Sequence, residues 1–186
     1  RFCTSDQSEN NFIYYVLGKK ERHTLADYVT GVEETSTNKI VLYSSAQTGK
    51  TTELKQLCWE LQQSGLYLPV SFEVRTNTKL KREDLPESQY VDGKEVVLVI
   101  DALDEVNGQK YEDLLEEIGG YAYEHPEMKM VLSCRSNFRR ERQLELFTEL
   151  FLEELSIDDA RDYAAKREVN SCLLYTSPSP RDGATS

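Results

Sequence analysis

Short apolar runs recur along the chain and are separated by polar or amphipathic stretches. Each run predicts a β-strand, and the run at residues 95–100 is apolar on both faces, as in the middle of a parallel sheet. A fifth strand is predicted over residues 147–155, although its alternation does not fit one strand face. The four clear runs cover residues 39–43, 68–74, 95–100 and 129–134.

Helical spacing fills most of the intervals between these runs. Leu54, Leu57, Cys58 and Leu61 follow the i, i+3, i+4, i+7 pattern of one helix face. Strands that alternate with helices predict an α/β fold of three layers, α/β/α, with a central, mainly parallel, five-stranded sheet and right-handed crossovers. The predicted helices cover residues 24–32, 49–65, 111–122 and 137–146, and a capping box at Ser156 and Asp159 opens one more; residues 76–93 read as a loop with one helical turn.

Composition narrows the classes of protein. The chain has 186 residues, of which 39% are hydrophobic and 30% charged, and its net charge is −11. An acidic chain is not by default a nucleic-acid-coating or membrane-surface protein. No apolar run approaches the roughly 18 residues of a membrane span, so we expect a soluble, cytoplasmic protein without a membrane partner. Four scattered cysteines, with no metal-ligand spacing, favour free thiols in a reducing compartment: Cys3, Cys58, Cys134 and Cys172.

Both ends of the chain differ from its middle. The chain begins with Arg1 rather than Met, and residues 1–38 are interpreted as a linker and helical segment at the end of a missing upstream region. Residues 39–170 are predicted to form the α/β domain, truncated by the chain ends. Residues 171–186 are Ser/Pro-rich, and the stretch 172–182 resembles an in-frame translation of a sequencing-library adapter; a natural linker is the alternative.

The loop after the first strand carries a phosphate-binding pattern. Residues 44–52 read SSAQTGKTT, which matches the last three positions of G-x-x-x-x-G-K-[ST] and has Ser44 at the first glycine. Backbone N–H groups and a helix N-terminus would bind an anion there, Lys50 would reach the β- and γ-phosphates, and Thr51 would bind Mg²⁺. A solvated helix start is the alternative for this segment alone. The predicted nucleotide-binding residues are Ser44, Ser45, Ala46, Gln47, Thr48, Gly49, Lys50, Thr51 and Thr52.

Carboxylates follow the third apolar run, in the segment VVLVIDALDE of residues 96–105. Carboxylates at the carboxyl end of a parallel strand lie where α/β folds bind ligands. Asp101 would hold Mg²⁺, directly or through water. Asp104 or Glu105 would orient or deprotonate an attacking water; both remain open, with a preference for Glu105. An acidic loop that caps the next helix is the alternative, but two motifs in this order favour a nucleotide site.

A third polar strand end follows at residues 133–136, which read SCRS. A polar residue there could sense a γ-phosphate, and Arg135 could stabilise charge on it. Arg139, Arg140 and Arg142 read more simply as a solvated face that pairs with acidic residues, so nucleic acid is not indicated. Two isolated histidines, His23 and His125, have no partners at metal-ligand spacing.

With these residues the chain resembles the NACHT branch of the STAND P-loop NTPases. Ser44, Gln47 and Cys134 depart from the family pattern. The resemblance covers about residues 24–167 and is carried by KIVLYSSAQTGKTTEL (39–54), VVLVIDALDEV (96–106), MVLSCRS (130–136) and FLEELSIDDARDYA (151–164).

The resemblance implies a nucleotide-driven switch that binds ATP or GTP with Mg²⁺ and hydrolyses it slowly. Its partners would be the nucleotide, further copies of itself through missing domains, and an unknown trigger ligand or protein; many bacterial relatives act in antiphage or stress signalling. The alternative functions are an AAA+ remodelling ATPase and a non-hydrolysing scaffold, and a small-molecule kinase is less favoured than either. The implied catalytic residues are Lys50, Asp104, Glu105 and Arg135, and the metal-binding residues are Thr51 and Asp101.

Overall fold

The computed structural model describes residues 14–16, 24–31, 37–46, 48–74, 80–106, 108–139 and 144–152. The strands are β1 (Tyr14–Val16), β2 (Lys39–Ser44), β3 (Tyr67–Glu73), β4 (Tyr90–Val91), β5 (Lys94–Asp101), β6 (Lys129–Arg135) and β7 (Thr148–Leu152). The α-helices are α1 (Leu25–Thr30), α2 (Lys50–Ser64) and α3 (Gln109–Glu124). Single 3₁₀ turns are η1 (Arg82–Asp84), η2 (Leu103–Glu105) and η3 (Ser136–Phe138).

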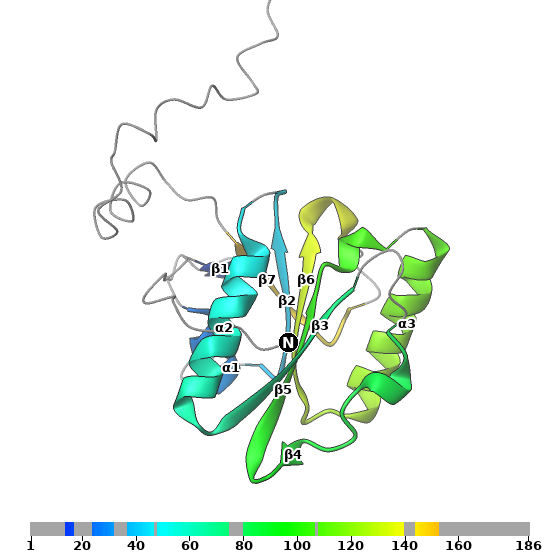
Figure 1. Cartoon of the computed structure of the whole chain (residues 1–186). Coiled ribbons are helices and arrows are strands. Elements are labelled where there is room, and N and C mark those ends of the chain that lie inside the picture. The colour runs from blue at the N-terminus through cyan, green and yellow to red at the C-terminus, as the bar shows by residue number, and fades with distance from the viewer. Residues whose placement is uncertain are drawn as a thin grey trace, which may run out of the picture. The chain divides into compact units, whose positions relative to one another are not determined.

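One sheet joins all these strands (Figure 1). Its centre is parallel, in the order β7-β2-β6-β5-β3. Two short strands add to it antiparallel, β1 beside β7 and β4 beside β5. The predicted α/β class with five mainly parallel strands is therefore confirmed. Because β6 lies between β2 and β5, the carboxyl ends of these three strands meet at one edge of the sheet.

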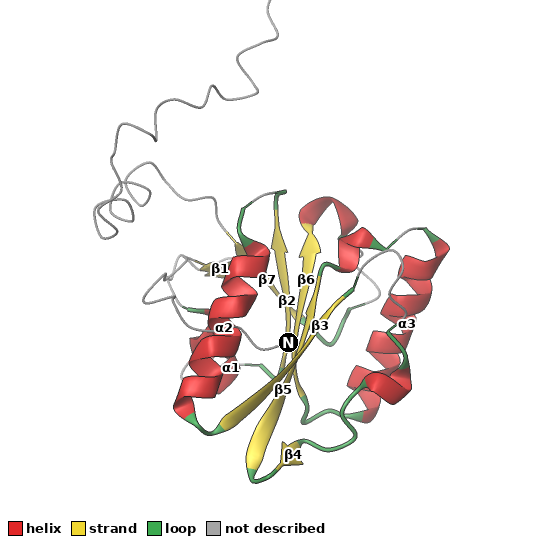
Figure 2. Cartoon of the chain, in the orientation of Figure 1, coloured by secondary structure: helices red, strands yellow, loops and turns green. Residues whose placement is uncertain are grey.

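Helices cover the two faces of the sheet and make three layers (Figure 2). On one face α1 and α2 pack against side chains such as Ile40, Leu42 and Val131. On the other face α3 packs against the alternate residues of the same strands, including Val41 and Leu132. Both faces of the central strands are thus buried, which explains their continuous apolar runs.

Local signals define the helix boundaries where the sequence predicts them. Thr24 caps α1 through a capping box with Asp27, and Gly31 ends the helix with a left-handed φ of 82°. Gly65 ends α2 with a φ of 71°. The apolar face of α2 buries Leu54, Leu57 and Leu61 against the sheet, as its spacing predicts.

The predicted helix over residues 137–146 is wrong in the part of it that the structure describes. The chain forms the turn η3, is extended at Arg139, and makes another turn at residues 144–147. The reason is tertiary, because the Tyr111 hydroxyl donates to the Phe138 carbonyl oxygen at 3.0 Å, and that oxygen would have bonded within a helix. The final predicted helix and residues 171–186 lie outside the described residues. The short strands β1 and β4 were not predicted.

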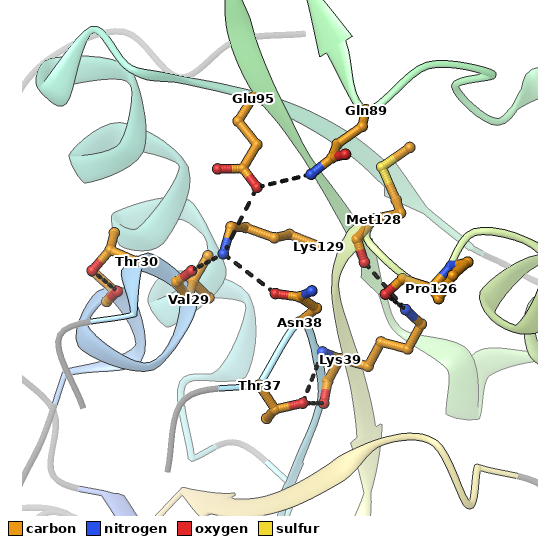
Figure 3. Close-up of polar contacts among 11 residues, drawn as sticks. Val29, Thr30, Thr37, Asn38, Lys39, Gln89, Glu95, Pro126, Met128 and Lys129 are labelled. Carbon is orange, nitrogen blue, oxygen red and sulfur yellow. Dashed lines mark hydrogen bonds and ion pairs between the residues drawn. The ribbon is translucent and has the colours of Figure 1, made fainter. Parts of the chain in front are cut away.

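Two lysines stand at the amino ends of neighbouring strands (Figure 3). Lys39 begins β2 and is 5% exposed. Its Nζ donates to the carbonyl oxygens of His125, Pro126 and Met128 at 3.1, 2.7 and 3.4 Å. Lys129 begins β6, donates to Val29 O of α1 at 2.8 Å, and lies 3.8 Å from Glu95 of β5. These contacts hold α1 and the loop between α3 and β6 against the amino edge of the sheet.

Candidate functional site

At the opposite edge, the loop between β2 and α2 prepares a helix N-terminus. Gly49 precedes α2 with a φ of 97°, a conformation that favours glycine, and its carbonyl oxygen accepts the first helical bond from Glu53 N at 3.0 Å. Lys50 is the first residue of the 15-residue helix. The first N–H groups of a helix have no acceptor within it and, with the helix dipole, favour an anion.

A cavity of about 290 Å³ opens in front of this helix end. It joins the start of α2 to the segments that follow β5 and β6, although these are some 50 to 85 positions apart in the chain. Its lining combines one lysine, one arginine and three carboxylates. The lining residues are Thr48, Gly49, Lys50, Thr51, Thr52, Asp101, Ala102, Asp104, Glu105 and Arg135.

Asp101 connects two of the strand ends with α2. Its Oδ2 accepts from the Thr51 hydroxyl at 2.8 Å, and its Oδ1 accepts from the Ser133 hydroxyl of β6. The Ser133 oxygen in turn accepts from Ala102 N at 3.1 Å. Ala102 has a φ of 64°, and this left-handed turn aims its N–H across to β6. Ser133 therefore orients the Asp101 carboxylate, and both are buried.

Asp104 and Glu105 occupy adjacent positions of η2 but have different surroundings. Asp104 Oδ2 lies 2.7 Å from Arg135 Nε, and Oδ1 accepts from Arg135 N at 3.0 Å. The Asp104 side chain is 4% exposed. Glu105 is exposed and lines the cavity. The two carboxylates that the sequence left as alternatives thus differ in exposure, and Asp104 is held by Arg135.

The first half of the predicted loop lies farther from the cavity than its second half. Ser44 is the last residue of β2 and is buried, while Ser45 and Ala46 are exposed, and none of the three lines the cavity. Among the described residues, the non-glycines with positive φ are Asp92 and Ala102, so Ser44 needs no glycine-like conformation. Gln47 lies outside the described residues.

Arg139 bonds to Glu149 at 2.8 and 2.6 Å, as expected for a residue that pairs with acids at the surface. Its predicted companions Arg140 and Arg142 lie outside the described residues. His125 follows α3 and its ring packs against Tyr121, with centroids 4.4 Å apart.

Burial makes two groups near this edge harder to ionise. Desolvation raises the pKa of the Cys134 thiol to about 11, although the hydrogen bond with Tyr111 acts in the other direction. Desolvation also raises the pKa of Tyr43 to about 12.

The donor set at Thr51 and Asp101 suits Mg²⁺, which prefers one or two protein oxygens and completes its octahedron with phosphates and water. Among the described residues no group of three or more His, Cys, Asp or Glu side chains is arranged to hold a metal ion by itself. A hydroxyl and a carboxylate in contact at a helix N-terminus fit a metal that arrives with a phosphate ligand. Within the described ranges, no helix combines the length and apolarity that crossing a bilayer requires.

Comparison with known proteins gives a structural likeness alone. No family model matches the chain. No curated protein matches it either. A solved structure of Hsp104 in its closed state, with ATPγS and FITC-casein, is similar over 68% of this chain at 14% sequence identity and a TM-score of 0.49. The chain covers about a quarter, 25%, of the length of that neighbour.

Proposed function

We propose that this chain is the nucleotide-binding core of a P-loop NTPase of the NACHT/STAND type. It binds ATP or GTP with Mg²⁺ and hydrolyses the nucleotide slowly. The observation that carries the proposal is the 2.8 Å contact between the Thr51 hydroxyl and the Asp101 carboxylate, at a helix N-terminus that begins with Lys50. A P-loop brings these three groups together for one purpose, which is to hold a phosphate–metal pair.

Each group has a role that follows from its chemistry. The N–H groups of the first turn of α2 bind phosphate oxygens, and Lys50 places a positive charge beside the β- and γ-phosphates. Thr51 and Asp101 would hold Mg²⁺, with the Asp101 carboxylate kept in its orientation by Ser133. When bound, the ion neutralises charge on the phosphates.

Water activation is assigned to Glu105. Glu105 is an exposed residue that lines the cavity, so a water held between it and a γ-phosphate would be replaced from solvent after each turnover. Arg135 lines the same cavity from the end of β6 and would contact the γ-phosphate. Glu105→Gln is expected to retain ATP binding and lose hydrolysis.

The finer assignment rests on the sequence motifs rather than on the fold. The segment DALDE at residues 101–105 and the strand end MVLSCRS, despite its departure at Cys134, support the NACHT branch, and with it a switch between an ADP-bound closed state and an ATP-bound state that oligomerises. A role in antiphage or stress signalling belongs to the same proposal. An AAA+ remodelling ATPase would instead turn over rapidly, so a high steady-state hydrolysis rate, sustained by equally rapid nucleotide exchange, would favour it.

Lys50→Ala tests the site directly. Loss of the phosphate-binding charge is expected to weaken ATP binding about 100-fold, measured by calorimetry with Mg²⁺. Lys55→Ala is the matched control, since Lys55 is an exposed lysine of the same helix. Equal ATP affinity in Lys50→Ala and the wild type would refute the site, and no ATP binding by the wild type would support the non-hydrolysing scaffold without a working loop.

A further inference from the structure

Asp104 is bound to Arg135 by both of its carboxylate oxygens. One oxygen accepts from the Arg135 backbone at 3.0 Å and the other contacts Nε at 2.7 Å. A group that removes a proton from water needs an oxygen directed at that water. Both Asp104 oxygens are directed at one residue of the neighbouring strand end, so its geometry suits a holder of Arg135 better than a base.

Arg135 has capacity beyond this contact. A guanidinium carries five N–H donors on three nitrogens in a rigid plane, and Nε supplies one of them. The Arg135 side chain is 44% exposed and lines the cavity, whereas the Asp104 side chain is 4% exposed. A carboxylate that holds the Nε edge therefore fixes the plane of the guanidinium while its terminal nitrogens can take a further anion.

The pair would persist when a phosphate arrives. If Arg135 left Asp104, a carboxylate with almost no solvent contact would lose its charged partner, which is strongly unfavourable. The backbone bond from Arg135 N holds the same carboxylate from the strand itself. In register, Arg135 lies opposite Ser44, so the guanidinium starts beside the phosphate loop.

We propose that Asp104 is a positioning residue that aims Arg135 at the γ-phosphate, and that this pair makes the site prefer nucleoside triphosphates over diphosphates. The inference rests on the proposed function. It removes Asp104 from the water-activating role that its sequence neighbourhood suggests and gives it a part in distinguishing the two nucleotide states.

The test compares affinities of the full chain for a non-hydrolysable ATP analogue and for ADP, each with Mg²⁺, by calorimetry. Asp104→Asn keeps an oxygen for the backbone N–H and removes the charge. Asp104→Asn is expected to lower the affinity for the triphosphate analogue roughly fivefold to tenfold and to change the affinity for ADP less than about twofold. Arg135→Ala is expected to do the same, and the double variant to be no weaker than Arg135→Ala alone.

Arg135→Lys is the second variant and leaves Asp104 in place with a cation beside it. A lysine ammonium is a point charge and cannot bind Asp104 with one set of N–H groups and a phosphate with another. Arg135→Lys is therefore expected to behave like Arg135→Ala rather than like the wild type. Glu116→Gln is the control, since Glu116 is an exposed acid on α3. Thermal unfolding of each variant verifies that it folds.

Several results would overturn the inference. Asp104→Asn could keep full triphosphate affinity and lose hydrolysis, which would make Asp104 a base. It could weaken ATP and ADP alike, which would make its role structural, or its effect could add to that of Arg135→Ala. In each case the wild type would still bind ATP about 100-fold more tightly than Lys50→Ala does, so the proposed function would stand. A wild type that binds neither nucleotide would overturn both.

Discussion

The two edges of the sheet use charge in opposite ways. At the amino edge, Lys39 and Lys129 donate to backbone carbonyl oxygens, whose positions are set by the fold (Figure 3). At the carboxyl edge, Asp101 and Asp104 receive bonds from side chains of other elements and line a cavity. The same strands, β2 and β6, connect the two edges.

The difference separates charges that bond to the backbone from charges that line a cavity. A lysine that bonds to backbone carbonyls holds together segments whose positions the fold sets, so it acts on stability. A carboxylate that bonds to hydroxyl and guanidinium groups can exchange or share those partners with a ligand. Three variants test whether stability and ligand binding divide between the edges in this way.

The largest expected effect belongs to the amino edge. Lys39→Met removes the charged donor shared by the carbonyl oxygens of His125, Pro126 and Met128, which is expected to lower the free energy of unfolding by about 3 kcal/mol, measured by urea unfolding. Nucleotide affinity is expected to stay unchanged. Lys81→Met is the control, because Lys81 forms an exposed pair with Glu83 and should alter stability by less than about 0.5 kcal/mol. A loss of nucleotide affinity in Lys39→Met would break the division.

A smaller effect is expected from the buried Cys134 thiol. The Cys134 thiol has its ordinary pKa of 9.0 in the unfolded chain, whereas burial raises its pKa to about 11 in the folded protein. The stability that this gives is complete below pH 9 and is lost as pH rises to 11, by roughly 2 kcal/mol. Cys134→Ala lacks this loss, so its stability relative to the wild type should improve steadily across that range. A constant difference from pH 8 to 11 would contradict the assignment.

The smallest expected effect tests the orientation of Asp101. Ser133→Ala removes the hydroxyl that bonds Asp101 and accepts from Ala102 N. Partners of a metal-binding carboxylate typically affect metal affinity tenfold or more, so we expect Mg²⁺-dependent ATP binding to need about ten times more Mg²⁺. Ser136→Ala, on the exposed turn η3, should titrate like the wild type. If both variants needed the same Mg²⁺ concentration, Ser133 would have no role in orienting Asp101 for Mg²⁺.

Much of the fold follows from local pattern. The apolar runs predicted β2, β5 and β6 to within one residue or two, because strands buried on both faces tolerate few polar side chains. Caps at Thr24 and Gly65 placed helix ends for equally local reasons. The predicted helix over residues 137–146 was wrong because the Phe138 carbonyl oxygen accepts a hydrogen bond from Tyr111 of α3. The local sequence gives no sign of this contact with another element.

The candidate site divides along the same line. Lys50, Thr51 and Asp101 were predictable, because each follows a strand in a recognisable order. The bond between Ser133 and Asp101 was not, since the two lie 32 positions apart and meet only when β6 inserts between β2 and β5. The separation of Asp104 from Glu105 depends likewise on where the end of β6 places Arg135.

The burial of β6 on both faces leaves its alignment with its neighbours underdetermined by hydrophobicity. Met130 and Leu132 face one core, while Val131 faces the other. If β6 shifted by one position against its neighbours, each apolar side chain would therefore be replaced by another apolar side chain. The polar contacts at the two strand ends distinguish the alternatives, with Lys129 bonded to Val29 and Ser133 bonded to Asp101. Ser133 and Asp101, which belong to the proposed metal site, therefore also help to select the pairing of the central strand, so a variant that loses their bond is expected to weaken that pairing as well.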